Sequence, residues 1–154
     1  MRIGQATETD IAEMSALLRA LAALGKRRRP FDPDFVRETY IAHPDRLHCG
    51  LAASGDGAIL GFQILKRAGP ENVYGVTPGW GIIGTHIHPS TARRGIGRTL
   101  FDATRRAAAE AGLDRIDATI GAANAEGRAY YEAMGFRTYR TPVGAICKLY
   151  EMTS

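Results

Sequence analysis

The sequence predicts an α/β domain of the layered α+β kind, with a mixed, mostly antiparallel central sheet of about six or seven strands flanked by about four helices. The chain has 154 residues and is 45% hydrophobic, which suits one domain, residues 1–154, with a proper core. Strand and helix patterns follow in the order strand, two helices, three strands, helix, strand, helix, two strands. Strand runs mixed with crossover helices imply a mixed sheet with helices on both faces.

The first elements are a short strand near residues 2–6 and a helix over about 10–24. The segment "TETD" supplies N-cap candidates for this helix, and apolar residues then recur at helical spacing. Glycine and two prolines interrupt the pattern over residues 25–33, which are therefore expected to form a loop. A second short helix is expected over residues 33–41.

The later elements are indicated by turn signals and by changes of period. Asp56-Gly57 is a strong hairpin signal, which joins two antiparallel strands. Gly112 and Gly135 are helix stop signals. We expect strands over 47–54, 57–67, 79–88, 114–120, 136–140 and 145–150, and helices over about 95–111 and 125–134.

The composition excludes several classes of protein. The net charge of +4 suits an anionic ligand but does not identify one. Cys49 and Cys147 have no metal-ligand spacing, so neither a disulfide framework nor a metal is expected. No segment approaches the length of a membrane span, so we expect a cytoplasmic protein without membrane contact. The basic run Lys26–Arg29 lacks an accompanying recognition motif, so no nucleic acid is expected either.

The segment "GWGIIG", residues 79–84, matches the GxGxxG pattern of dinucleotide-binding proteins. That fingerprint requires a strand before it and a helix that opens within it, whereas these glycines lie inside an apolar run that continues to Pro89. Thr85 also stands where a Walker A motif needs its lysine. The segment is therefore interpreted as part of a strand.

The segment "STARRGIGRTL", residues 90–100, places three arginines where a helix opens at Gly95 or Gly97. A helix N-terminus is already positive, so arginines are mildly repelled there. A bound pyrophosphate would reverse this balance, because free backbone N–H groups at a helix start bind phosphate oxygens and glycines allow close approach. The alternative is a plain glycine-rich turn with solvated arginines.

A second group of residues lies in "NAEGRAYYEAMGF". Asn124 is a natural N-cap, and Tyr131 follows seven residues later on the same side of the helix, about 10 Å along its axis. A cap and a core tyrosine are the simpler interpretation of these residues taken alone.

Taken together, the two segments resemble the GCN5-related N-acetyltransferase (GNAT) family, and the likeness is strongest from about Ile82 to Arg137. The family's pyrophosphate loop, Q/R-x-x-G-x-G/A, corresponds to residues 92–97. Ala92 departs from it by standing where the family has Gln or Arg. A second pattern, N-x-x-G/A-x-x-F/Y-Y-x-x-x-G-F, is met by Asn124, Gly127, Tyr130, Tyr131, Gly135 and Phe136.

This resemblance implies a GNAT-like fold and acetyl-CoA as co-substrate. The pyrophosphate would lie on the backbone amides of the loop and the pantetheine arm alongside the strand near Ile87 and His88. Asn124 would help to hold that arm, and Tyr131 would sit by the thioester sulfur as general acid toward the leaving thiolate. The implied cofactor-binding set is Ile87, His88, Arg93, Arg94, Gly95, Ile96, Gly97, Arg98, Thr99, Asn124, Gly127 and Tyr131.

The expected reaction is transfer of an acetyl group to a primary amine of a small molecule or peptide, by direct attack in a ternary complex. The family's usual base positions align with Gly81 and Ile83, which cannot titrate. His86 and His88 are the nearest candidates, but they would point to the other face of the strand. Because no base is identified, a non-catalytic acyl-CoA-binding sensor or partner domain is the alternative.

The acceptor and the assembly are open at this level. If Lys26–Arg29 is functional, it suggests an acceptor with a carboxylate or phosphate, or an acidic protein surface; Asp32 and Asp34 nearby weaken that inference. The family often dimerises, so a homodimer is expected by analogy alone.

Overall fold

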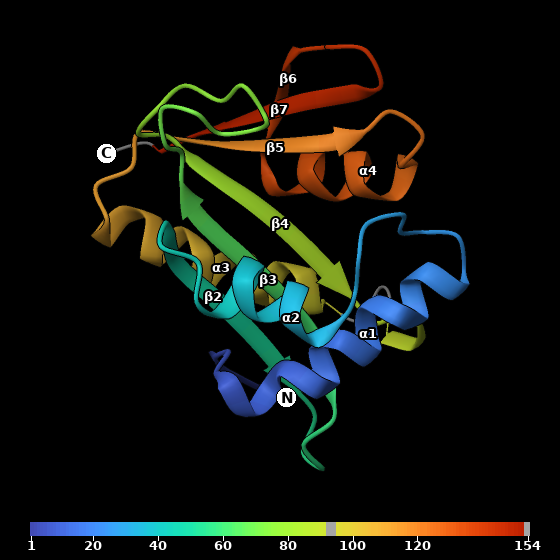
Figure 1. The fold of residues 1–154 in the computed structure, drawn as a ribbon. Coiled ribbons are helices and arrows are strands. Elements are labelled where there is room, and N and C mark those ends of the chain that lie inside the picture. The colour runs from blue at the N-terminus through green and yellow to red at the C-terminus, as the bar shows by residue number, and fades with distance from the viewer. Residues whose placement is uncertain (92–94, 153–154) are drawn as a thin grey trace.

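A seven-stranded sheet forms the centre of the computed structural model, which describes residues 1–91 and 95–152 (Figure 1). The strands lie in the order β1-β2-β3-β4-β5-β7-β6, and each neighbouring pair is antiparallel except β4 with β5. Their bounds are β1 Arg2–Gln5, β2 Arg46–Ala53, β3 Ile59–Arg67, β4 Gly81–Ile87, β5 Arg115–Gly121, β6 Arg137–Arg140 and β7 Ala145–Glu151. The mixed, mostly antiparallel sheet predicted from the sequence is confirmed.

Helices cover both faces of this sheet. Their bounds are α1 Ile11–Ala23, α2 Pro33–Val36, α3 Ile96–Glu110 and α4 Ala125–Met134. On one face, Met14 and Leu18 of α1 and Val36 of α2 lie in one buried cluster with Phe62 of β3. On the other face, α3 and α4 pack through Phe101 and neighbouring apolar side chains against Leu65 of β3. Each such buried side chain contributes roughly 1.5–3 kcal/mol, so the two clusters hold the layers together.

The ends of α4 follow the signals expected from the sequence. The Asn124 side chain accepts a hydrogen bond from the Gly127 N–H at 3.0 Å, which makes it the N-cap. Gly135 ends the helix in the left-handed region, with φ of 107°, which glycine adopts without steric cost. The predicted bounds of this helix are confirmed.

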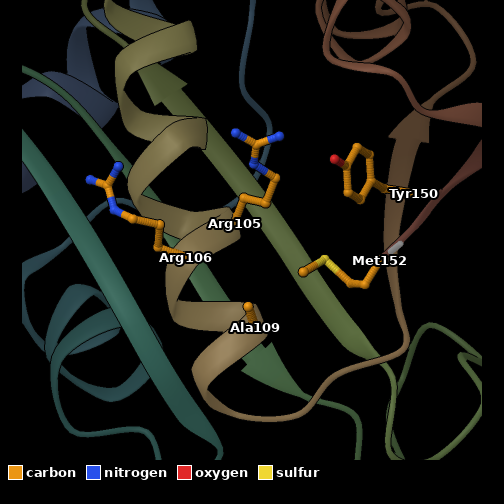
Figure 2. Close-up of a pocket in the computed structure, with 5 residues that line it drawn as sticks. All are labelled: Arg105, Arg106, Ala109, Tyr150 and Met152. Carbon is orange, nitrogen blue, oxygen red and sulfur yellow. The ribbon is translucent and has the colours of Figure 1, made fainter. Parts of the chain in front are cut away.

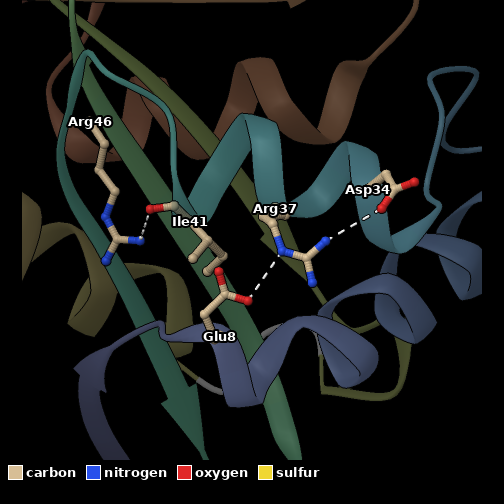
Figure 3. Close-up of polar contacts among 5 residues, drawn as sticks. All are labelled: Glu8, Asp34, Arg37, Ile41 and Arg46. Atoms are coloured by element: carbon tan, nitrogen blue, oxygen red, sulfur yellow. Dashed lines mark hydrogen bonds and ion pairs between the residues drawn. The ribbon is translucent and has the colours of Figure 1, made fainter.

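The second helix expected from the sequence, over residues 33–41, is divided between a short α-helix and a π-helical segment. After α2, residues Arg37–Ile41 continue as a π-helical segment. Figure 3 shows Arg37 reaching toward Glu8 and Asp34, and Arg46 reaching back to the end of the segment. Arg46 Nη1 donates to the Tyr40 and Ile41 carbonyls at 2.8 and 3.2 Å, which satisfies the acceptors that the widened turn leaves free.

β4 and β5 begin side by side and then diverge (Figure 1). Their parallel pairing covers only Gly81 with Ile116 and Ile82 with Asp117, although β4 continues to Ile87. On its other edge, β4 pairs with β3 over seven positions. The backbone of the second half of β4 therefore has one edge in the ladder with β3 and one edge that no longer pairs with β5. We refer to this separation of the two strand backbones as the opening between β4 and β5.

In residues 1–91 and 95–152, no helix combines the length and apolar character needed to cross a membrane.

Candidate functional site

A chain of hydrogen bonds includes Thr85, in the half of β4 that no longer pairs with β5. The Tyr131 hydroxyl lies 2.8 Å from Thr85 Oγ1, and Gln63 Nε2 donates to Thr85 Oγ1 at 2.8 Å and to the Tyr130 hydroxyl at 2.9 Å. The Tyr130 hydroxyl donates to the Gly97 carbonyl at 2.7 Å. The chain therefore links β3, β4, α4 and the first turn of α3 in one polar network.

One fixed acceptor sets part of this network. The Gly97 carbonyl can only accept, so Tyr130 must donate to it and must itself accept from Gln63 Nε2. The second hydrogen of Nε2 then serves Thr85 Oγ1. Thr85 Oγ1 and the Tyr131 hydroxyl share a further hydrogen bond, in which either oxygen can be the donor.

Gln63 is fully buried, and its Oε1 atom has no partner among the described residues. An unsatisfied buried amide oxygen costs about 1–3 kcal/mol. The fold retains this unsatisfied oxygen, while the Nε2 group of the same amide orients the Thr85 and Tyr130 hydroxyl groups. Sequence reasoning missed both Gln63 and Thr85. A polar side chain in the otherwise apolar run "GFQIL" was the available signal.

Tyr131 lies in a largely apolar environment, with 7% of its surface exposed and its ring 5.1 Å from the Phe136 ring. Burial raises the pKa of its phenol well above the ordinary value, and the Thr85 hydrogen bond offsets only part of this effect. Tyr131 is therefore protonated throughout the physiological pH range. It can serve as a hydrogen-bond donor but not as a base.

Gly97 is required by packing. A Cβ placed on it would lie 2.5 Å from Tyr130 Cε1, much closer than van der Waals contact. The sequence argument attributed the glycines of this loop to close approach of phosphate, but the close neighbour of Gly97 is the tyrosine ring. Gly95 is the conformational glycine, because it is the N-cap of α3 with φ of 77° and open space around it.

The start of α3 presents backbone donors. The amides of Ile96, Gly97 and Arg98 precede the first intrahelical bond and have no hydrogen-bond partner among the described residues, so they are available to an anion. That bond is made by Thr99, whose N–H donates to the Gly95 carbonyl at 3.1 Å and whose hydroxyl donates to the same oxygen at 3.0 Å. Thr99 was expected to bind the cofactor, but its amide is already engaged in this bond and is not available to the pyrophosphate.

The remaining predicted cofactor residues lie around the opening. Asn124 is exposed, and its Oδ1 is engaged as the helix cap, so the cap interpretation is confirmed. Gly127 leaves room for that cap, since a Cβ there would lie 2.6 Å from Asn124 Nδ2. Ile87 and His88 end β4, where the His88 N–H donates to the Leu60 carbonyl at 2.8 Å. Arg93 and Arg94 lie outside the described residues.

Comparison with protein-family models decides the family. The model of the Acetyltransferase (GNAT) family matches residues 14–136, a range that includes the loop before α3 and all of α4. The chain belongs to this family. It is accordingly an N-acetyltransferase, and its fold class is that of GNAT structures.

Three solved structures illustrate the likeness of the fold. A GCN5-related N-acetyltransferase from Kribbella flavida superposes with a TM-score of 0.80 at 17% identity, covering 97% of this chain and 96% of that one. The paia N-acetyltransferase from Thermoplasma acidophilum, solved in complex with coenzyme A, gives 0.74 at 16% identity over 97% and 98%. The yncA protein from Salmonella typhimurium, solved with its cofactor acetyl-CoA, gives 0.75 at 16% over 100% and 95%. A search of curated proteins found no match.

The two histidines considered as candidate bases, His86 and His88, have different environments. His86 is half-buried, and its Nε2 lies 3.2 Å from the Tyr40 hydroxyl. Burial, reinforced by the positive charges of Arg27 and Arg29, lowers the pKa of His86 to about 3. Such an imidazole is neutral at pH 7 but too weak to retain a proton from an alkylammonium. His88 Nδ1 lies 2.8 Å from Ser90 Oγ and accepts the Ser90 N–H at 3.1 Å.

A buried carboxylate that sequence reasoning did not identify lies where β4 and β5 separate. Asp117, paired with Ile82, accepts hydrogen bonds from Thr119 Oγ1 at 2.7 Å and from the Tyr139 hydroxyl at 2.5 Å. Burial raises the pKa of its carboxyl, and the two hydrogen bonds oppose that rise. Both oxygens of Asp117 are thus engaged in holding β5 to the side chain of Tyr139.

The surface hollow in Figure 2 belongs to another part of the domain. It lies between the later turns of α3 and the end of β7, and is lined by Arg105, Arg106, Ala109, Tyr150 and Met152. Arg105 is about 14 Å along α3 from Ile96, and Ala109 is about 20 Å from it, at 1.5 Å per residue. The hollow is therefore separate from the free amides at the start of the helix.

The described residues contain no group of three or more His, Cys, Asp or Glu side chains arranged to hold a metal ion.

Proposed function

We propose that this domain transfers an acetyl group from acetyl-CoA to a primary amine of a small molecule or peptide, by direct attack of the amine in a ternary complex. The observation that carries the proposal is the hydrogen-bond chain that ends at Tyr131 and passes through Thr85, in the part of β4 that has separated from β5. Acetyl-CoA supplies the activated acetyl group as a thioester. The residues of this chain bind the cofactor, orient it and assist departure of its sulfur.

The start of α3 fits the pyrophosphate. The amides of Ile96, Gly97 and Arg98 have no partner in the part of the chain that the structure describes, the helix dipole is positive there, and the first turn contains no acidic residue. A Cβ on Gly95 would meet no described atom within 4 Å. The free edge of β4 suits the amides of a pantetheine arm, because its backbone groups no longer pair with β5 after Ile82.

Tyr131 suits the leaving sulfur. Thr85 Oγ1 can donate to the Tyr131 oxygen, and in that arrangement the Tyr131 hydrogen is available for the thiolate that forms as the acetyl group departs. The raised pKa makes Tyr131 a weaker acid than free tyrosine, so a strong hydrogen bond to the thiolate is favoured over complete proton transfer. The amine must reach this site neutral, which costs a lysine-like acceptor roughly 4.5 kcal/mol at pH 7.

The first prediction concerns cofactor binding. Saturating acetyl-CoA at about 100 times its Kd is expected to stabilise the protein by about 2.7 kcal/mol, or a rise in Tm of roughly 5–10 °C. S-Acetylpantetheine, which lacks the pyrophosphate, should give a much smaller rise at the same concentration. Differential scanning fluorimetry measures both. Equal shifts from the two ligands would remove the start of α3 from the cofactor site.

A further inference from the structure

The loop between α1 and α2 holds two arginines over one aromatic ring. The guanidinium carbons of Arg27 and Arg29 lie 5.5 and 5.3 Å from the centre of the Phe35 ring. Arg27 donates from Nε and Nη2 to the Pro30 carbonyl at 3.1 and 2.6 Å, and Arg29 Nη1 donates to the Tyr74 hydroxyl at 3.0 Å. Both guanidinium groups are thus positioned by neutral partners.

The carboxylates nearest to this loop in sequence are engaged elsewhere. Asp32 accepts the Phe35 N–H at 3.1 Å as the N-cap of α2, and Asp34 pairs with Arg37 at 3.4 Å. Among the described residues, the ion pairs of the loop include Lys26 with Glu126 at 3.0 Å but none with Arg27 or Arg29. Two like charges on one ring without a carboxylate repel each other, and a bound anion would relieve that repulsion.

This pair of charges connects to β4 through the cluster on the α1–α2 face of the sheet. The Tyr40 ring packs between Phe35 and Phe62, and its hydroxyl is 3.2 Å from Nε2 of His86 on β4. His86 directly follows Thr85, the partner of Tyr131, and the two side chains point to opposite faces of the strand. The positive charges of Arg27 and Arg29 extend to His86, where they lower its pKa further than burial alone.

The loop between α1 and α2 also contacts α4. The Lys26–Glu126 pair joins it to the first turn of α4, which begins at the cap residue Asn124. Both side chains of this pair are substantially exposed, so it contributes little energy, but it shows that the loop and α4 face each other.

We propose that Arg27 and Arg29 form an acceptor subsite for an oxyanion, so that the acceptor is a small amine that also carries a carboxylate or phosphonate, as an amino acid does. This inference rests on the proposed acetyltransfer and specifies its substrate class. The planar guanidinium groups can each give two parallel hydrogen bonds to such a group. The amine of the same molecule would then be directed toward β4 and Tyr131.

The test compares matched acceptors by release of the coenzyme A thiol. The acceptors are L-amino acids, the corresponding amino acid amides and the corresponding 1-aminoalkylphosphonates. We expect kcat/KM for the best amino acid or phosphonate to exceed that of its amide by at least about 10-fold. Arg27→Gln and Arg29→Gln should each lower kcat/KM for the anionic acceptor by about 10–100-fold and for the amide by less than about 2-fold.

Arg28→Gln is the matched control, because it removes the same charge from the same loop. Arg28 is exposed and is not part of the proposed subsite. All three variants should keep the wild-type Tm shift with acetyl-CoA, which shows that they fold and bind cofactor. Thiol release with neutral amines or peptides but not with anionic small acceptors, or equal losses on acid and amide, overturns this inference and leaves the proposed function standing. Absence of release with every acceptor contradicts the proposed function itself.

Discussion

Replacement of Tyr131 by phenylalanine is expected to lower kcat by about 100-fold or more, while the KM for acetyl-CoA changes by less than about 2-fold. The hydroxyl is the only group lost, and the ring keeps its contact with Phe136. Because the hydrogen bond to sulfur strengthens as negative charge develops, its loss acts on the transition state more than on cofactor binding. Steady-state kinetics with thiol detection measures both constants. Unchanged turnover would remove Tyr131 from the chemistry.

Thr85→Val provides the matched comparison for Tyr131→Phe. Valine keeps the shape of threonine but cannot hydrogen-bond to Tyr131, so the Tyr131 hydroxyl loses the partner that orients it toward the sulfur. We expect kcat to fall by about 10-fold. Because Thr85 acts through Tyr131, adding Thr85→Val to the Tyr131→Phe variant should cause little further loss. Full additivity of the two effects would show that Thr85 acts independently.

Replacement of Gly97 by alanine is expected to destabilise the fold, although alanine is the better helix former. Helix propensity alone would favour the change by about 1 kcal/mol. The new methyl group would meet the Tyr130 ring at 2.5 Å, and overpacking of this kind costs about 1–3 kcal/mol. Displacement of the ring also breaks its hydrogen bonds to the Gly97 carbonyl and to Gln63. We expect a fall in Tm of several degrees, measured by thermal unfolding, together with reduced turnover.

Gly55→Ala is the control for this substitution. Gly55 lies in the β2–β3 hairpin, has an ordinary φ and has open space where a Cβ would stand. The Tm of the Gly55→Ala variant should change by no more than about 2 °C, because a surface substitution changes the free energy of unfolding by about 0.5 kcal/mol or less. A rise in Tm for Gly97→Ala would mean that Tyr130 moves away without cost, and the polar network would then be looser than the distances indicate.

Elements with strong local signals were predicted from the sequence, whereas those set by distant contacts were not. The Asn124 cap and the Gly135 stop define α4 at both ends, so its bounds follow from local chemistry. The π-helical segment after α2 depends on Arg46 of β2, whose side chain satisfies two of its carbonyls. No local pattern in residues 37–41 indicates that partner.

The site shows the same division between local and distant determinants. Tyr131 and the start of α3 were predicted because their motifs are contiguous in sequence. Gln63 and Thr85 were missed because they meet only through the β3–β4 register, which pairs these two positions directly. The packing role of Gly97 was also missed, since Tyr130 is 33 residues away in the chain. Pairing between strands brings these residues together, and a single sequence does not specify it.

The most direct test of the proposed function is release of coenzyme A thiol from acetyl-CoA in the presence of a panel of amines, amino acids and peptides, with mass spectrometry of the acceptor. The proposal predicts thiol release that depends on a particular acceptor, with an acceptor product heavier by one acetyl group. Binding of acetyl-CoA without acceptor-dependent release across the whole panel would contradict it, and would instead support a domain that binds acyl-CoA without catalysing transfer.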